Sequence, residues 1–185
     1  MGADKAGLLL GNQPLWRRQL EILRATGAQE VLISGPASGP YGDSGVPLVR
    51  DQVAGQGPLA GIAGGLRQAR WDRLLVLAID MPLMSSEFLR ELVEQSRQAG
   101  RSVIPKDQQW YEPLGAVYQR DCLALAEAHL LLSDRSLQHF LRAADQQGLI
   151  VDRALSPEEL RLFVNLNSPA DVAAAGTLRL PGSAD

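Results

Sequence analysis

The sequence contains few of the residues that build disulfides or metal centres. Among 185 residues there is one cysteine, Cys122, and there are two histidines. A single cysteine excludes an intramolecular disulfide and every zinc site that needs several cysteines, and it is typical of a protein in a reducing compartment. His129 and His139 stand in helix-like stretches without a partner motif, and we interpret both as ordinary helix residues.

A long apolar run and a surplus of positive charge are also missing. The longest apolar run, from Leu74 to Ile79, is far shorter than the roughly eighteen residues of a membrane span, and the first residues do not form a basic-then-apolar secretory signal. The net charge of −3 leaves no basic surplus to neutralise a nucleic acid or an anionic membrane. We therefore expect a cytoplasmic protein that binds small molecules or proteins, and neither nucleic acid nor membrane.

Lysine is scarce as well. Of the 18 lysine and arginine residues, only two are lysines, Lys5 and Lys106. A Walker phosphate loop needs a lysine followed by serine or threonine at a set distance from two glycines. Here Ala6 and Asp107 follow the two lysines, so the protein is not a P-loop NTPase.

The remaining composition is that of an ordinary folded domain. Hydrophobic residues make up 45% and charged residues 21% of the chain, and this length favours one domain. Periodic apolar residues predict helices over about 14–27, 57–70, 85–100, 121–131, 137–148 and 169–175, and strands over 31–34, 48–50, 73–79, 102–105, 114–118 and 149–151. This alternation predicts an α/β three-layer domain with a mostly parallel sheet over residues 1–180, followed by a frayed tail at 181–185.

Asp80 is the first candidate for chemistry. It follows directly on the apolar run that ends at Ile79, and ligands of open parallel sheets bind beyond the carboxyl ends of the strands. A carboxylate there suits magnesium, which is usually held by one or two carboxylates, substrate phosphates and water. The alternative is that Asp80 only caps the turn before Pro82.

The glycine-rich segment 55–61 is a second candidate. Gly55, Gly57 and Ala60 match three positions of the dinucleotide fingerprint, but the preceding residues are polar instead of a buried strand. A plainer interpretation is a turn at Gly57 and Pro58 that opens a helix, whose free amides favour an anion. The later glycines of this helix can equally serve its close packing on the sheet.

Six short motifs occur in order along almost the whole chain. They are Met1–Lys5 with Pro14-Leu15, Asp51, Gly57–Gly61, Asp80-Met81-Pro82, Glu112-Pro113-Leu114 and Asn165–Pro169. In this order and spacing the sequence resembles the molybdenum cofactor guanylyltransferases. It also resembles the molybdopterin cytidylyltransferases, which share the Gly-Pro-Leu and Asp-Met-Pro elements; the last two motifs favour the guanylyl branch.

The resemblance implies a Rossmann-like nucleotidyltransferase fold and a reaction that depends on Mg2+. In that reaction GMP passes from GTP to molybdopterin or its molybdenum form, and pyrophosphate is released. Molybdoenzymes or their chaperones are the implied protein partners. The cytidylyl counterpart, which would use CTP, is the alternative within the same class of enzyme.

The resemblance also implies a nucleotide site. Lys5 matches a lysine that meets the nucleotide, Asp51 matches an aspartate at the nucleotide site, and Asp80 matches the magnesium-binding aspartate. Ser34 stands where some members have an asparagine that contacts the nucleotide. The implied nucleotide-binding residues are Gly2, Lys5, Ser34, Asp51, Gly57, Pro58 and Asp80, of which Lys5 and Asp80 are the catalytic candidates.

The implied chemistry brings two anions together, because a phosphate monoester attacks the α-phosphate of GTP. A metal on one side and a fixed cation such as Lys5 on the other would offset this repulsion. Pro113, Asn165 and Asn167 are the candidates for the pterin side of the site. The alternative for these residues is a structural role in turns and loops.

The sequence departs from the family at its start. Members begin with a strand and a glycine-rich loop, Leu-Ala-Gly-Gly followed by an arginine, directly before the Met-Gly that is here Met1-Gly2. The strand would lie centrally in the sheet, and the loop would wrap the nucleotide. We expect the functional protein to extend upstream of Met1 by about ten to fifteen residues. The alternative is a degenerate, non-catalytic domain that binds molybdopterin or a partner protein.

Overall fold

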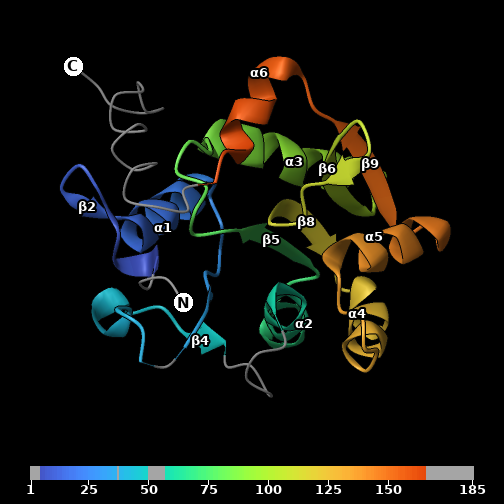
Figure 1. Ribbon diagram of the computed structural model, residues 1–185, viewed down its shortest axis with the longest axis horizontal. Helices are drawn as coiled ribbons and strands as arrows, with labels where there is room; N and C mark the ends of the chain where they lie inside the picture. The colour runs from blue at the N-terminus through green and yellow to red at the C-terminus, as the bar shows by residue number, and fades with distance from the viewer. Residues whose placement is uncertain (1–4, 37, 50–56, 166–185) are drawn as a thin grey trace.

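The computed structural model describes residues 5–36, 38–49 and 57–165, in which helices and strands alternate (Figure 1). The helices are α1 (Leu15–Ala25), α2 (Pro58–Gln68), α3 (Ser86–Ala99), α4 (Cys122–Leu130), α5 (Leu137–Gln146) and α6 (Pro157–Leu160), with 3-10 turns η1 (Lys5–Gly7), η2 (Gly42–Ser44) and η3 (Arg161–Phe163). The strands are β1 (Leu9–Leu10), β2 (Gln13–Pro14), β3 (Ile33–Ser34), β4 (Leu48–Val49), β5 (Arg73–Leu77), β6 (Ser102–Asp107), β7 (Trp110–Tyr111), β8 (Gly115–Gln119) and β9 (Ile150–Ala154).

The main sheet has five strands in the order β5-β8-β6-β7, with β9 on the other edge of β6. The pairing is more mixed than the sequence predicts: β6 and β9 are parallel, whereas β8 is antiparallel to both β5 and β6. Between β6 and β8 the chain forms only the short β7, without a crossover helix. Such a connection returns the chain in the opposite direction, because parallel neighbours need a long crossover.

Two smaller strand pairs lie toward the amino-terminal part of the chain. β1 and β2 form an antiparallel hairpin that the sequence analysis did not predict, and β3 pairs in parallel with β4. Ile33 of β3 and Leu48 of β4 pack against a separate hydrophobic cluster, which includes Trp16, Leu20 and Tyr41. The rings of Trp16 and Tyr41 meet edge to face with 5.9 Å between their centres.

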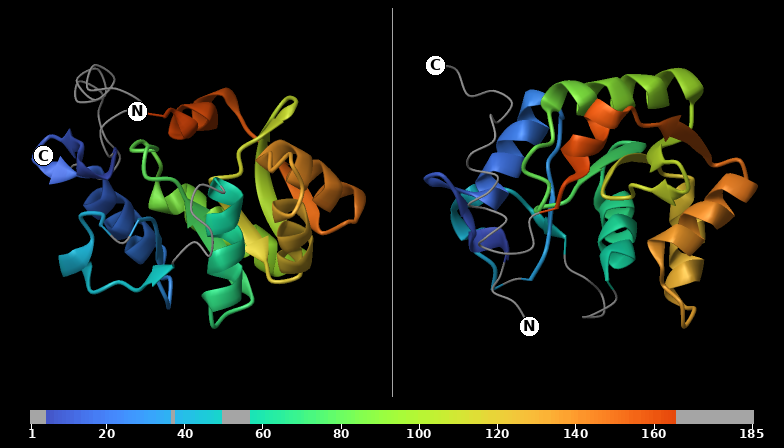
Figure 2. Two further views of the ribbon diagram at one scale, coloured as in Figure 1. Left: turned by 60° about the horizontal axis from the view of Figure 1, so that its bottom comes forward. Right: turned by 45° about the horizontal axis from the view of Figure 1, so that its top comes forward.

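Helices cover both faces of the main sheet, as the three-layer prediction requires. Figure 2 shows α3 on one side of the sheet and α2, α4 and α5 on the other. Leu59, Tyr118 and Phe140 are buried on the α2 side, and Leu92 and Val117 belong to a second buried cluster on the α3 side. The α/β fold class predicted from the sequence is confirmed.

Local signals set several of the helix boundaries. Ser85 caps α3 by accepting a hydrogen bond from the Phe88 amide at 3.1 Å, and Gly100 ends it with a φ of +63°. Pro58 stands in the first turn of α2, after Gly57 with a φ of +73°. At that angle a side chain would be strained, so glycine suits the turn.

Some predictions on the carboxyl-terminal part stay untested or need revision. The helix predicted at 169–175 and the tail at 181–185 lie outside the described residues. β9 is longer than the predicted 149–151, and α6 was not predicted. Across the described ranges, no helix is long and apolar enough to cross a membrane.

Candidate active site

The loop after β5 carries Asp80. β5 ends at Leu77, two residues before the predicted end, and the chain turns at Asp80, which is partly buried. The Ala78 amide donates a hydrogen bond of 2.7 Å to the Leu114 carbonyl, so the loop is tied to the segment before β8. Asp80 therefore lies just beyond the carboxyl end of β5, as the sequence predicts.

Helix α1 holds this loop through two polar side chains that the sequence analysis missed. Gln19, only 5% exposed, donates through Nε2 to the carbonyls of Ala78 at 2.9 Å and Met81 at 2.8 Å. Arg18 Nε donates to the Pro82 carbonyl at 2.9 Å. The sequence contained a signal for this role of Gln19, because Gln19 interrupts an otherwise apolar helix face. A side-chain amide that is buried on such a face needs hydrogen-bond partners.

A cavity of about 380 Å³ lies between the Asp80 loop, β3 and the start of α2. Asp80, Ser34, Gly57 and Pro58 all line it, and so does Leu114. The structure thus brings four of the seven predicted nucleotide-site residues around one space.

Glycine in α2 makes this arrangement possible. A Cβ placed on Gly61 would stand 2.6 Å from the Ser34 Oγ, closer than side-chain carbons approach. Gly61 therefore lets α2 lie directly against β3, and it also lines the cavity. The sequence predicted that the later glycines of this helix allow it to pack closely on the sheet, and Gly61 does so beside the cavity.

The Glu-Pro-Leu segment supports the same edge of the sheet. The Pro113 carbonyl accepts a hydrogen bond of 2.8 Å from the buried Tyr118 hydroxyl, and Leu114 contacts the Asp80 loop as described. The neighbouring Glu112 is half-buried, and burial together with the charge of Asp107 raises the pKa of its carboxyl group. Pro113 thus fixes the segment that holds the Asp80 loop.

The other predicted site residues are not brought to this cavity by the described structure. Asn165 is exposed beyond η3 and is not among the lining residues. Gly2, Asp51 and Asn167 lie outside the described residues. Lys5 begins η1, and the next residue, Ala6, is buried in the cluster that Ile79 contacts.

The second lysine has a structural pairing. Lys106 Nζ lies 2.6 Å from the Asp152 carboxylate across the β6–β9 pair, and this hydrogen bond raises the pKa of the lysine. It also lies 4.5 Å from the centre of the Tyr111 ring. Lys106 therefore holds the strands β6, β7 and β9 together, which agrees with its position outside every motif.

The cysteine and histidines have ordinary environments. Cys122 is buried, and burial raises the pKa of its thiol to about 11, so it is not an activated nucleophile. His129 hydrogen-bonds the Leu125 carbonyl within its own helix, and His139 pairs with Asp134. Over the described ranges, no group of three acidic, histidine or cysteine side chains could hold a metal by itself.

These features define a class of protein. In this α/β domain a carboxylate beyond the end of β5 faces the start of helix α2 across one cavity, and ligands of open α/β sheets bind beyond the carboxyl ends of the strands. Residues 1–148 match the MobA-like NTP transferase domain. The chain belongs to this family, and it is a nucleotidyltransferase.

Curated relatives in the family carry a more specific name. The chain is 36% identical over 176 residues to the probable molybdenum cofactor guanylyltransferase of Opitutus terrae, covering 92% of this chain and 86% of that protein. It is 32% identical over 178 residues to the molybdenum cofactor guanylyltransferase of Syntrophotalea carbinolica, covering 92% of this chain and 82% of the other.

Solved structures give the same fold. The molybdopterin-guanine dinucleotide biosynthesis protein A of Archaeoglobus fulgidus superposes with a TM-score of 0.76 at 26% identity, over 95% of this chain and 90% of that one. A cytidylyltransferase of Thermus thermophilus, which acts on 2-C-methyl-D-erythritol 4-phosphate, superposes with a TM-score of 0.69 at 17% identity, over 94% of this chain and 93% of the other. The second likeness concerns the fold alone.

Proposed function

We propose that the protein transfers GMP from GTP to molybdopterin or its molybdenum form, with Mg2+ as cofactor and pyrophosphate as the second product. The observation that carries this proposal is the cavity at the end of β5, around which Asp80, Ser34, Gly57 and Pro58 converge. The names of the curated relatives support the choice of base and acceptor.

The reaction needs no covalent intermediate on the protein. A phosphate oxygen of the pterin attacks the α-phosphorus of GTP and forms a new P–O bond. The bond from the α-phosphorus to the bridging oxygen breaks, and pyrophosphate leaves with the electron pair. Both reactants are anions, so the protein must offset their repulsion and the charge that develops in the transition state.

Asp80 is the residue that would hold the metal. One carboxylate suits magnesium when substrate phosphates and water complete the shell. Asp51 is the second acidic residue that we assign to the nucleotide site. Bound there, magnesium would neutralise charge on the triphosphate.

The remaining nucleotide contacts come from α2, β3 and the start of the chain. The first turn of α2 offers backbone amides and the positive end of the helix dipole, both of which favour a phosphate group. Ser34 faces the same cavity with a hydroxyl that can donate or accept. We assign Lys5 to the triphosphate, with Gly2 beside it in the same motif.

Pro113, Asn165 and Asn167 are our candidates for the pterin side. Pro113 belongs to the segment that is tied to the Asp80 loop, so this segment can connect the pterin side with the metal side. Molybdoenzymes or their chaperones would then take up the dinucleotide product.

Replacement of Asp80 tests the assignment of the metal ligand. Asp80→Asn keeps the size of the side chain but removes the ligand charge, so we expect a loss of at least 100-fold in pyrophosphate release with an unchanged melting temperature. The matched control is Asp72→Asn, an exposed aspartate before the first residue of the same strand, which should retain the parental rate. A folded Asp80→Asn protein with parental turnover would remove Asp80 from the site.

A further inference from the structure

The loop that follows β3 begins at the candidate nucleotide cavity. β3 ends at Ser34, which lines that cavity, and the chain continues past Gly35 and Gly39 to Tyr41. The Tyr41 side chain is only 7% exposed, although it stands in this loop at the start of the 3-10 turn η2. Connecting loops usually run over the surface, so a buried aromatic ring indicates that this loop is held in one path.

The Tyr41 ring packs against α1. It belongs to a hydrophobic cluster, which we call the Trp16–Tyr41 cluster and whose buried members are Ala6, Trp16, Leu20 and Tyr41. The Tyr41 ring meets the Trp16 ring edge to face, at an angle of 88° between the ring planes. This is a favoured arrangement of two aromatic rings, so Trp16 fixes the position of Tyr41.

The Trp16–Tyr41 cluster also contacts both walls of the candidate nucleotide cavity. Ile33 and Ile79 both pack against the cluster. Ile33 directly precedes Ser34 in the sequence, and Ile79 directly precedes Asp80. Ser34 and Asp80 both line the cavity, so one cluster supports the two walls immediately behind the residues that face the nucleotide.

Two glycines of the loop leave the space that the Tyr41 ring fills. A Cβ on Gly39 would stand 2.7 Å from Cδ2 of the ring and closer still to Cε2, whereas a Cβ on Gly35 would stand 3.1 Å from Cε2. A side chain at Gly39 would therefore force the ring away from Trp16 or open the loop. Gly42 differs from both, because no described atom lies within 4 Å of a Cβ placed there.

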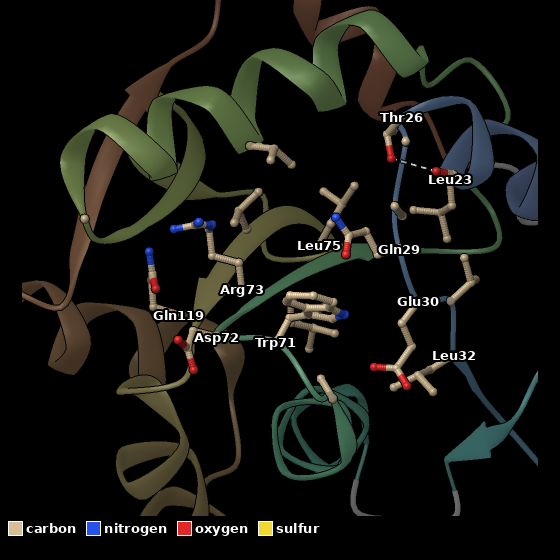
Figure 3. A pocket seen from close by; sticks show the side chains of 18 residues that line it. Leu23, Thr26, Gln29, Glu30, Leu32, Trp71, Asp72, Arg73, Leu75 and Gln119 are labelled. Carbon is tan, nitrogen blue, oxygen red and sulfur yellow. Dashed lines mark hydrogen bonds between the residues drawn. The ribbon is translucent and has the colours of Figure 1, made fainter.

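Helix α2 holds β3 from its other side. Gly61 lies directly against Ser34, as described above, and the Glu30 carboxylate accepts hydrogen bonds from the Arg70 amide at 3.0 Å and from Arg70 Nε at 3.1 Å. Figure 3 shows Glu30 on the segment that leads from α1 to β3, beside a cavity of about 520 Å³. Contacts with α2 thus fix β3 up to Ser34, and the Trp16–Tyr41 cluster holds the chain beyond it.

We propose that Tyr41 is a positioning residue of the nucleotide site, which holds Ser34 at the distance from Asp80 that a bound nucleotide requires. This inference rests on the proposed function, because it takes the cavity between Ser34 and Asp80 as the nucleotide site. Tyr41 is not among the residues that line the cavity. It therefore acts through Ile33 and Gly35, without touching the substrate.

The expected effect of Tyr41 differs from that of Gln19. Gln19 anchors the Asp80 loop by hydrogen bonds, so this loop keeps its support when the Tyr41 ring is displaced. The wall that contains Ser34 contacts the nucleotide in the ground state and in the transition state alike. Loss of such an interaction raises KM and leaves kcat nearly unchanged.

A series of alanine substitutions in the loop tests the proposal. Gly39→Ala, Gly35→Ala and Gly42→Ala add the same methyl group where it meets the Tyr41 ring severely, slightly and not at all. Tyr41→Leu removes the ring, and Tyr41→Phe keeps it. Calorimetry gives the nucleotide Kd of each variant with magnesium and without molybdopterin, for GTP and for CTP, and KM, kcat and the melting temperature are measured as well.

We expect Kd and KM to rise by roughly tenfold or more in Gly39→Ala and Tyr41→Leu, and by less in Gly35→Ala. Both constants should stay within about twofold of the parental values in Gly42→Ala and Tyr41→Phe, and kcat within about threefold in every variant. A folded Gly39→Ala protein that binds nucleotide as tightly as Gly42→Ala would overturn the proposal. If Gly39→Ala does not fold, the comparison of Gly35→Ala with Gly42→Ala takes its place.

Two other outcomes separate this inference from its alternatives. A lower melting temperature with an unchanged Kd in Gly39→Ala and Tyr41→Leu would contradict the proposal, because the ring would then serve stability alone. A parental protein that binds nucleotide but releases no pyrophosphate would count against the proposed function. The order of the Kd values among the variants would still support the role of Tyr41 in that case.

Discussion

Asp80 and Gln19 meet at the same loop, one as the proposed metal ligand and the other as its support. The carbonyls of Ala78 and Met81 flank Asp80 and point to the amide of Gln19. The Oε1 atom of Gln19 is buried, and no donor in the described residues reaches it. Gln19 therefore holds the loop through its Nε2 donor. Its Oε1 atom can still accept a hydrogen bond from a donor outside the described residues.

Replacement of Gln19 tests this support. Gln19→Leu leaves two carbonyls without their donor, so we expect the free energy of unfolding to fall by about 2 to 4 kcal/mol. The Mg2+ concentration needed for half-maximal transfer should also rise severalfold, because the Asp80 loop loses its anchor. Urea denaturation and a magnesium titration measure the two effects.

Gln98→Leu is the matched control, since Gln98 is exposed on α3 and bonds only Glu94 in the described structure. Gln98→Leu should change neither the free energy of unfolding nor the Mg2+ concentration needed for half-maximal transfer appreciably. A Gln19→Leu protein that loses stability but keeps the parental magnesium dependence would reduce Gln19 to a purely structural residue.

At the scale of secondary-structure elements, α6 shows how one ion pair links a helix start to a strand. Ser156 and Glu159 form a capping box, and Arg153 of β9 donates to both carboxylate oxygens of Glu159. The hydrogen bonds from Arg153 hold the pKa of Glu159 at about 2, below its usual 4.5. Arg153 also lies over the Phe88 ring of α3, so this pair joins three elements.

The low pKa of Glu159 predicts a pH dependence of stability. A carboxyl group whose pKa is depressed in the folded state stabilises the protein above its unfolded pKa and loses this effect as the pH falls through the folded value. We expect stability to decline between about pH 4.5 and pH 2. Glu159→Gln should flatten this decline and cost about 1 to 3 kcal/mol at pH 7.

Denaturant unfolding measured across this pH range checks the prediction. The neighbouring exposed Glu158→Gln variant serves as the control and should follow the parental curve. Parallel curves of unfolding free energy against pH for the parental protein and Glu159→Gln would show that the ion pair makes no net contribution to the pH dependence of stability.

At the scale of the whole molecule, the sequence predicts the local elements well and their assembly less well. β5, α2 and α3 were predicted because a buried apolar run, a proline after glycine and a serine cap are local signals. The reversed direction of β8 and the full length of β9 were not, because strand pairing depends on partners far along the chain.

The residues of the candidate site also fall into those that local patterns predict and those whose role depends on distant parts of the chain. Local patterns place Asp80 beyond a strand end and Gly57 and Pro58 at a helix start, the family resemblance assigns them to one site, and the structure puts them around one cavity. Gln19 was missed because its role depends on a loop about sixty residues away in the sequence.

The most direct test of the central claim is pyrophosphate release from the purified protein with molybdopterin and magnesium, given GTP, CTP or ATP in turn. We expect release with GTP to exceed that with CTP or ATP by at least 100-fold, because a site that hydrogen-bonds one base leaves its polar groups unpaired with another. Preferential use of CTP would assign the protein to the cytidylyl branch, and molybdopterin binding without any pyrophosphate release would contradict the account of a transferase.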